Sequence, residues 1–129
     1  MNKPNRTYHH GDLRSALLDE AAAMIAEGGT ESVTMRALGE RLGVSRAAAY
    51  RHFEDKTALL VAVAAAGFRR LNERLQEIEA GAPESSVERA RRMGEEYVRF
   101  ALENPAHYRL MYGREAMRRQ NLPELREAG

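Results

Sequence analysis

Residues 34–53, which read TMRALGERLGVSRAAAYRHF, predict two short helices joined by a tight turn. Thr34 is a good helix N-cap, and two leucines follow on one helix face at a spacing of four. Gly43 has the backbone freedom that ends this helix, and Ser45 caps the next one after a three-residue turn. Two helices with so short a connection form a helix-turn-helix, whose second helix enters the major groove of DNA. The segment therefore indicates an all-α head with double-stranded DNA as its partner.

The charge of the chain supports this partner only locally. Over 129 residues, 20 basic side chains nearly balance 19 acidic ones, so no general attraction to a polyanion is expected. Residues 34–53 instead carry four arginines against Glu40 alone, a net +3, and Lys3 and Arg6 add positive charge near the amino terminus. Neutralising phosphates needs such a patch on one face. Arginines on solvated helix faces are the alternative reading.

Length and composition exclude several classes of protein. The 129 residues suffice for one domain, or for one small domain with part of another. The absence of cysteine excludes disulfides and thiolate metal sites. The longest apolar run, residues 59–68, is too short to span a bilayer, and the opening MNKPNRTYHHGDL lacks the apolar core of a signal peptide. We therefore expect a cytoplasmic protein with no membrane contact.

Helical periodicity runs through almost the whole chain, and no alternating stretch is long enough for a strand. At 1.5 Å per residue, a helix over 56–80 would be about 38 Å long, more than a three-helix head needs, so its later half should pack on a second region. We therefore expect a DNA-binding head in residues 1–56, and a connecting helix with part of a second domain in 57–129. The expected helices are 12–27, 35–42, 46–52, 56–80 capped by Asp55, 87–103 capped by Ser86, and 106–112, between a polar arm (1–10) and a weakly patterned end (113–129) with a helical turn after Pro123.

The segments GDLRSALLDEAAAMIAEGG and VTMRALGERLGVSRAAAYRHFEDKTALL resemble the TetR family of bacterial transcriptional regulators. The turn, Tyr50, Phe53 and Lys56 stand at the offsets of the family pattern, and NPAHYRLMYG is similar to the ligand-binding region of a TetR subgroup. The resemblance implies an all-α protein with a three-helix DNA-binding head, a long connecting helix and a helical regulatory domain. Family members usually continue for two further long helices that form the dimer interface, and we expect this chain to stop before them.

Carried over residue by residue, the resemblance implies a DNA-reading face on the second helix of the motif. Arg46 would bond guanine through two hydrogen bonds, and the methyl groups of Ala47 and Ala48 would touch thymine methyls. Arg36, on the preceding helix, would reach a base edge or a phosphate. Because larger polar residues often stand in place of these alanines in the family, DNA shape is expected to contribute more than direct base contacts.

Phosphate contacts are expected from residues around this face. The candidates are Thr34, Tyr50, His52 and Lys56, with Lys56 aided by the N-terminus of its own helix. Packing in the core is the alternative for Tyr50, and packing under Phe53 is the alternative for His52. The complete set of expected DNA-binding residues is Thr34, Arg36, Ser45, Arg46, Ala47, Ala48, Tyr50, His52 and Lys56.

An aromatic and methionine stripe marks the second region. Such a stripe is ordinarily core packing, and only the family resemblance favours a small-molecule pocket, which would then suit an apolar or aromatic ligand. His9 and His10 lack further metal-ligand partners, and no catalytic motif occurs, so we expect no metal, no cofactor and no enzymatic activity. The expected ligand-binding residues are Met93, Tyr97, Phe100, Tyr108, Met111 and Tyr112.

These features predict a sequence-specific transcriptional regulator, most simply a repressor that a small-molecule effector releases from DNA. One head reads only a few base pairs, so a homodimer on a palindromic operator is expected. A ligand-insensitive architectural DNA-binding protein is the alternative function.

Overall fold

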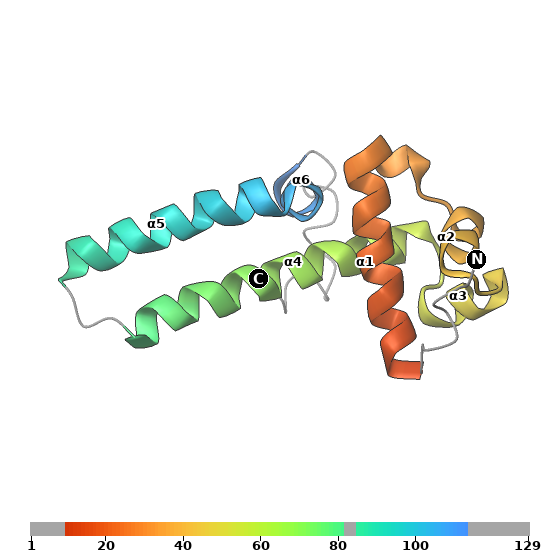
Figure 1. Cartoon of the computed structure of the whole chain (residues 1–129), viewed down its shortest axis with the longest axis horizontal. Coiled ribbons are helices and arrows are strands. Elements are labelled where there is room, and N and C mark those ends of the chain that lie inside the picture. Colours follow the sequence, from red (N-terminus) through yellow and green to blue (C-terminus); the bar gives the residue numbers. More distant parts are fainter. Residues whose placement is uncertain (1–9, 82–84, 114–129) are drawn as a thin grey trace. The chain divides into compact units, whose positions relative to one another are not determined.

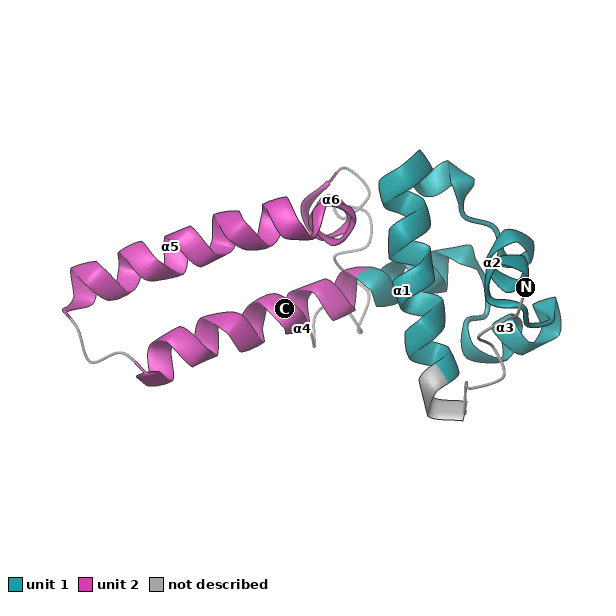
Figure 2. Cartoon of the chain, in the orientation of Figure 1, with its two compact units in different colours: residues 1–63 teal, residues 64–129 magenta. Residues whose placement is uncertain are grey.

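The computed structural model describes residues 10–81 and 85–113, and the chain divides into two compact units, residues 1–63 and 64–129 (Figure 2). The regular structure in these ranges consists of α-helices and one 3₁₀ turn, and no strand occurs in them (Figure 1). The predicted all-α class is therefore confirmed. The long helix α4 contributes residues to both units. The elements are α1 (His10–Gly28), the 3₁₀ turn η2 (Thr30–Ser32), α2 (Met35–Leu42), α3 (Arg46–His52), α4 (Lys56–Gly81), α5 (Ser86–Glu103) and α6 (Pro105–Tyr112).

Capping residues define where the two helices of the helix-turn-helix begin and where the first one ends. Thr34 Oγ1 accepts a hydrogen bond of 3.0 Å from the backbone N–H of Ala37, which begins α2. Gly43 ends α2 in the left-handed conformation, with φ at 73°. Ser45 Oγ accepts a 3.0 Å hydrogen bond from the N–H of Ala48, which begins α3. The three predicted signals are therefore confirmed.

The core of the first unit forms where the apolar stripes of α1 and α2 meet the start of α4. One connection was not predicted: after Gly29, whose φ is 82°, the turn η2 brings Ser32 back to α1. Ser32 Oγ donates to the carbonyl oxygens of Gly29 and Met24 at 2.8 and 3.1 Å, which closes this turn. The fully buried side chains are Leu17, Ala21, Ile25, Val33, Leu38, Ala49, Leu59 and Val63.

Helix α2 and the turn that follows it approach each other closely at Gly39. A Cβ atom at this position would lie 2.8 Å from the backbone oxygen of Val44. In return, the N–H of Val44 donates a 2.9 Å hydrogen bond to the carbonyl of Gly39. The turn can fold onto α2 only because residue 39 has no side chain.

In the second unit, α6 packs on the part of α4 that begins at residue 64. A Cβ atom at Gly67 would lie 3.0 Å from His107 Cβ and 2.7 Å from Met111 Sδ, so the glycine permits this close packing. Phe100 of α5 is fully buried, and Leu110 nearly so. These contacts make a small aromatic and aliphatic core.

An ion-pair network joins α4 and α5 within the second unit. Glu96, which is only 8% exposed, accepts hydrogen bonds from Arg74 at 2.9 Å and Arg99 at 2.6 Å. Arg74 also reaches Glu103 at 3.1 Å. The hydrogen bond with Glu96 raises the pKa of Arg74 above its usual value. The buried carboxylate is therefore fully compensated.

Some predicted helix ends were wrong. The N-cap of α5 is Ser85, whose Oγ accepts from the N–H of Glu88 at 3.2 Å, and not Ser86, which is the first helical residue. Pro105 is the first residue of α6, a position where its missing N–H is harmless, so it opens this helix instead of only ending the previous one. Helix α1 begins at His10. The expectations for residues 1–9 and 114–129 lie outside the described residues.

Candidate nucleic-acid interface

Helix α3 turns one side chain inward. Ala49 is fully buried in the first unit, and Ala48 is half-buried. Tyr50 is 46% exposed, so the alternative of core packing for this ring was wrong. The exposed side chains of α3 are Arg46, Ala47, Tyr50 and Arg51. The helix therefore presents two guanidinium groups, a phenol and a methyl group on its outer surface.

Three expected DNA-binding residues lie at helix starts. Thr34 and Ser45 are exposed, and capping uses their oxygens only as acceptors, so each hydroxyl hydrogen stays available to a phosphate. Lys56 is half-buried at the first position of α4. The preceding Asp55 accepts a 2.9 Å hydrogen bond from the N–H of Ala58, as predicted for a cap.

The arginines of the motif are not equivalent. Arg36 is exposed, as are Arg46 and Arg51, and none of the three forms an ion pair with a described residue. Arg41 instead bonds two carboxylates of α1, Glu20 and Glu27. Counting Arg41 toward a +3 patch therefore overestimated the charge that this segment offers to DNA.

His52 and Phe53 lie together at the end of α3. The two ring centroids are 6.5 Å apart and tilted by 48°, and His52 is half-buried, whereas Phe53 is buried. The guanidinium of Arg14, on α1, lies 4.9 Å from the centre of the Phe53 ring. A cationic group above the ring face is attracted to it, which fastens α1 to the end of α3.

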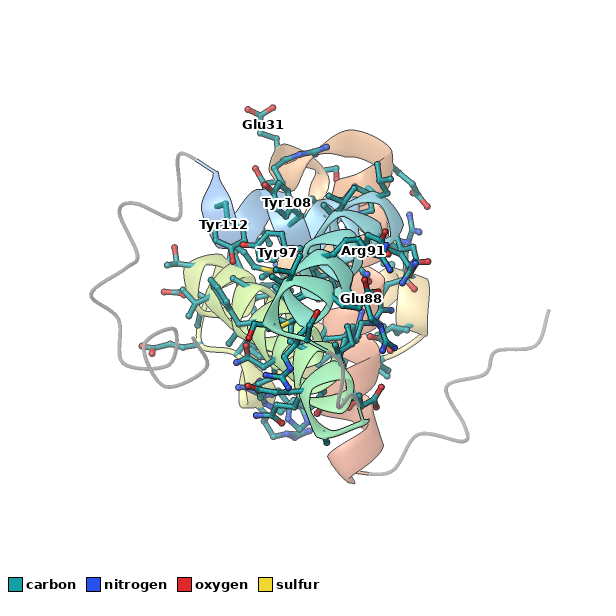
Figure 3. The ribbon with its side chains drawn as sticks, turned by 90° about the vertical axis from the view of Figure 1, so that its left-hand side faces the viewer. Glu31, Glu88, Arg91, Tyr97, Tyr108 and Tyr112 are labelled. Atoms are coloured by element: carbon teal, nitrogen blue, oxygen red, sulfur yellow. The ribbon has the colours of Figure 1, made fainter. Side chains whose placement is uncertain are left out.

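A cluster of three tyrosines lies on α5 and α6 in the second unit (Figure 3). The Tyr97 hydroxyl donates a 2.6 Å hydrogen bond to the Tyr112 hydroxyl. The rings of Tyr108 and Tyr112 have centroids 5.2 Å apart, and Phe68 meets Tyr112 edge-on at 5.5 Å. The three tyrosines are between 37% and 46% exposed, so a molecule in solution can contact them.

The predicted ligand stripe divides between this cluster and the core. Phe100 is fully buried and Met111 is 4% exposed, while Met93 is half-buried. An open hollow of about 390 Å³ lies beside the cluster. Tyr108 and Tyr112 line it together with Arg109, and the lining residues that were not among the predicted ligand contacts are Ala101, Pro105 and Gly113. Only Pro105, three positions before Tyr108 on α6, has the spacing of a shared helix face, so the other two could not be read from the sequence.

The environment of Tyr112 suppresses ionisation of its phenol. Burial raises the pKa of Tyr112, and the neighbouring phenols of Tyr97 and Tyr108 raise it further. Because the unfolded chain has the lower pKa, folding gains stability from this group below about pH 10 and loses it as the pH rises toward the folded value.

This shift predicts a late step in an alkaline titration. In the parent chain, absorbance at the phenolate band should show one tyrosine ionising well after the others. In Tyr97→Phe, that step should move to lower pH, because the contribution of the neighbouring Tyr97 phenol to the raised pKa of Tyr112 is lost. Tyr50→Phe, far from the cluster in sequence, is the control and should leave the late step in place. An unshifted late step in Tyr97→Phe would contradict the arrangement.

Comparison with known proteins identifies the first unit. Residues 17–63 match the model of "Bacterial regulatory proteins, tetR family". The chain is 41% identical over 63 residues to the transcriptional repressor KstR of Rhodococcus jostii, and 45% identical over 53 residues to the class C tetracycline repressor protein of Escherichia coli. The first unit is a TetR-family DNA-binding head.

Structural similarity to solved proteins extends beyond the head. A protein of unknown function from Rhodococcus sp. RHA1 superposes with a TM-score of 0.77 at 35% identity, over 96% of this chain and 63% of its own. The ketosteroid transcriptional regulator KstR2 of Mycobacterium tuberculosis gives a TM-score of 0.69 at 25% identity, over 89% and 58%. The chain spans about 30% of KstR and 24% of the tetracycline repressor.

Two further findings concern other kinds of site. Among residues 10–81 and 85–113, no group of three or more histidine or carboxylate side chains is arranged to hold a metal ion. None of the helices in these ranges has the length and apolar character that a bilayer crossing needs. His9 lies outside the described residues, and the side chain of His10 is not described.

Proposed function

We propose that this chain, whose head is of the TetR family, is a sequence-specific DNA-binding transcriptional repressor that acts in the cytoplasm and has no catalytic activity. The observation that carries the proposal is helix α3, which is anchored by Ala49 and presents Arg46, Tyr50 and Arg51 to solvent. The names of the matched relatives support it, since they are transcriptional repressors. A protruding helix of this kind fits the major groove.

The proposal divides the DNA contacts into two kinds. Arg46 and the methyl groups of Ala47 and Ala48 read base edges, because an arginine fork matches guanine and methyl groups match thymine. Arg36 reaches a base edge or a phosphate. The phosphates are held by Thr34, Ser45, Tyr50, His52 and Lys56, and the exposed Arg51 joins this set.

Replacing Arg46 should therefore lower specific binding most. Arg46→Ala should lower operator affinity by about 1–3 kcal/mol and relax the base preference at one position. Lys56→Ala should weaken all DNA sequences alike and reduce the slope of log affinity against log salt by about 1. Fluorescence anisotropy at several salt concentrations measures both, on a duplex selected by the parent chain from a random library. Arg69→Ala, an exposed arginine of the second unit, is the control. Wild-type binding by both head variants would refute the assigned face.

The second part of the proposal is that a small molecule releases the repressor. The head then occupies residues 1–56, and residues 57–129 hold the connecting helix and ligand-binding and dimerisation elements. Because α4 belongs to both units, a ligand that favours one packing of α4 in the second unit would change how two heads of a homodimer meet a palindromic operator. Only a ligand with different affinity for the two arrangements can do so.

The tyrosine cluster and its hollow suggest the class of this ligand. Three aromatic rings offer apolar surface. The Tyr108 and Tyr112 hydroxyls offer hydrogen-bond donors, because Tyr112 accepts from Tyr97 and keeps its own hydrogen, so a neutral apolar or aromatic molecule with an oxygen acceptor fits best. One matched structure is named a ketosteroid regulator, and a ketosteroid has this chemistry. The other expected members, Phe100 and Met111, would shape the site from beneath.

A panel of compounds tests this part. A ketosteroid or a neutral phenol at 100-fold its dissociation constant should raise the unfolding free energy by about 2.7 kcal/mol and weaken operator binding. A dicarboxylate should do neither. A Tyr108→Phe, Tyr112→Phe double variant should lose most of the stabilisation. Equal stabilisation of the parent and the double variant by a compound would rule out the proposed pocket. If no compound weakens operator binding, the architectural alternative is favoured.

A further inference from the structure

Arg41 uses all three nitrogens of its guanidinium to bind two carboxylates of α1. Its Nε donates to Glu20 at 2.6 Å, and its two Nη atoms donate to the two oxygens of Glu27 at 3.2 and 3.3 Å. Glu20 and Glu27 are seven residues apart, about two helical turns, so they lie on one face of α1. A single arginine therefore bridges two turns of α1.

The surroundings of Arg41 are acidic. Hydrogen bonds from Glu27 and then Glu20 raise the pKa of the Arg41 guanidinium above its usual value. The adjoining hollow of about 380 Å³ is lined by Glu27 and by Glu40 as well as by Arg41. With two carboxylates on one guanidinium and a third nearby, this side of the head repels a phosphate backbone.

The position of Arg41 in the chain matters for α3. It lies in the last turn of α2, two residues before Gly43, where the chain leaves α2 toward the recognition helix. A planar guanidinium that forms two hydrogen bonds with a carboxylate fixes the orientation of the two groups as well as the distance between them. Holding this turn against α1 therefore restricts the angle at which α3 leaves the head.

We propose that Arg41 is a positioning residue for DNA recognition: its links to Glu20 and Glu27 hold α2 on α1, and so orient α3, without contact to phosphate. The inference rests on the proposed function, since it concerns how the head reads DNA. It distinguishes Arg41 from Arg36, an exposed arginine on the same helix.

Two variants with opposite charge changes test this role. Arg41→Ala removes one positive charge, and the double variant Glu20→Gln, Glu27→Gln removes two negative charges. A positioning role predicts that both lower the ratio of specific to non-specific affinity, on the order of fivefold. A phosphate contact predicts that the double variant binds both kinds of DNA at least as selectively as the parent. Arg41→Lys, which keeps the charge but loses the planar fork, should recover part of the ratio.

The affinities are measured over a salt series on the library-selected duplex and on a shuffled duplex, at a temperature where circular dichroism shows every variant folded. Arg41→Ala should keep the parental salt slope, whereas Arg36→Ala should reduce it by about 1 if Arg36 meets a phosphate. A salt slope reduced by about 1 in Arg41→Ala, or an unchanged ratio of specific to non-specific affinity in both test variants, contradicts the role of Arg41 but leaves the proposed function standing. A parent that binds both duplexes equally contradicts the proposed function, and this inference with it.

Discussion

Phe100→Ala should lower the unfolding free energy of the second unit by about 3–5 kcal/mol. Phe100 is fully buried between α5 and the rest of this unit, with the guanidinium carbon of Arg74 5.7 Å from its ring centre. Truncation leaves a cavity that the surrounding helices fill only in part. Thermal unfolding followed by circular dichroism measures the loss.

Leu102→Ala is the matched control for this variant. Leu102 lies on the same helix and is 77% exposed, so its loss should change stability by no more than about 0.5 kcal/mol. If Phe100→Ala unfolds like the parent and yet abolishes ligand binding, Phe100 belongs to the pocket and not to the core.

Gly39→Ala should abolish specific DNA binding and lower the stability of the head by about 1–3 kcal/mol. The new Cβ would lie 2.8 Å from the Val44 oxygen and 3.6 Å from backbone atoms of Ser45. These are backbone atoms, so no side-chain rotation relieves the overlap. The turn must move away from α2, and α3 moves with it. Operator affinity and thermal unfolding are the measurements.

The same substitution at Gly94 should have the opposite effect on stability. Gly94 lies within α5, and a Cβ atom there meets nothing within 4 Å. Alanine is the better helix former by about 1 kcal/mol, so this variant should be more stable than the parent. Gly39→Ala behaving like Gly94→Ala would show that the turn is looser than the structure has it.

The parts of this fold that short-range rules control could be predicted from the sequence. Thr34 and Ser45 cap the motif helices within three residues of their own position, so the pattern of letters is sufficient. The N-cap of α5 was misplaced by one residue because two serines adjoin. The signal that separates them was present, since Ser85 stands three residues before Glu88, the spacing of a capping box.

Contacts between helices could not be read in the same way. Arg41 and Glu20 are 21 residues apart, and only the packing of α2 on α1 brings them together. The sequence therefore suggested a solvated or DNA-facing cation at position 41. Tyr97 and Tyr112 were both selected, yet their spacing could not show that they share a hydrogen bond on the surface while Phe100 is fully buried.

The single inward side chain of α3 has a consequence for how operator preference can change. Within α3, Ala49 is the buried side chain, whereas positions 46, 47, 50 and 51 are exposed. Exposed substitutions usually alter stability by only about 0.5 kcal/mol. New combinations at these four positions can therefore arise without loss of the fold. A lineage, or a randomised library, can then sample many DNA targets without compensating substitutions that restore stability.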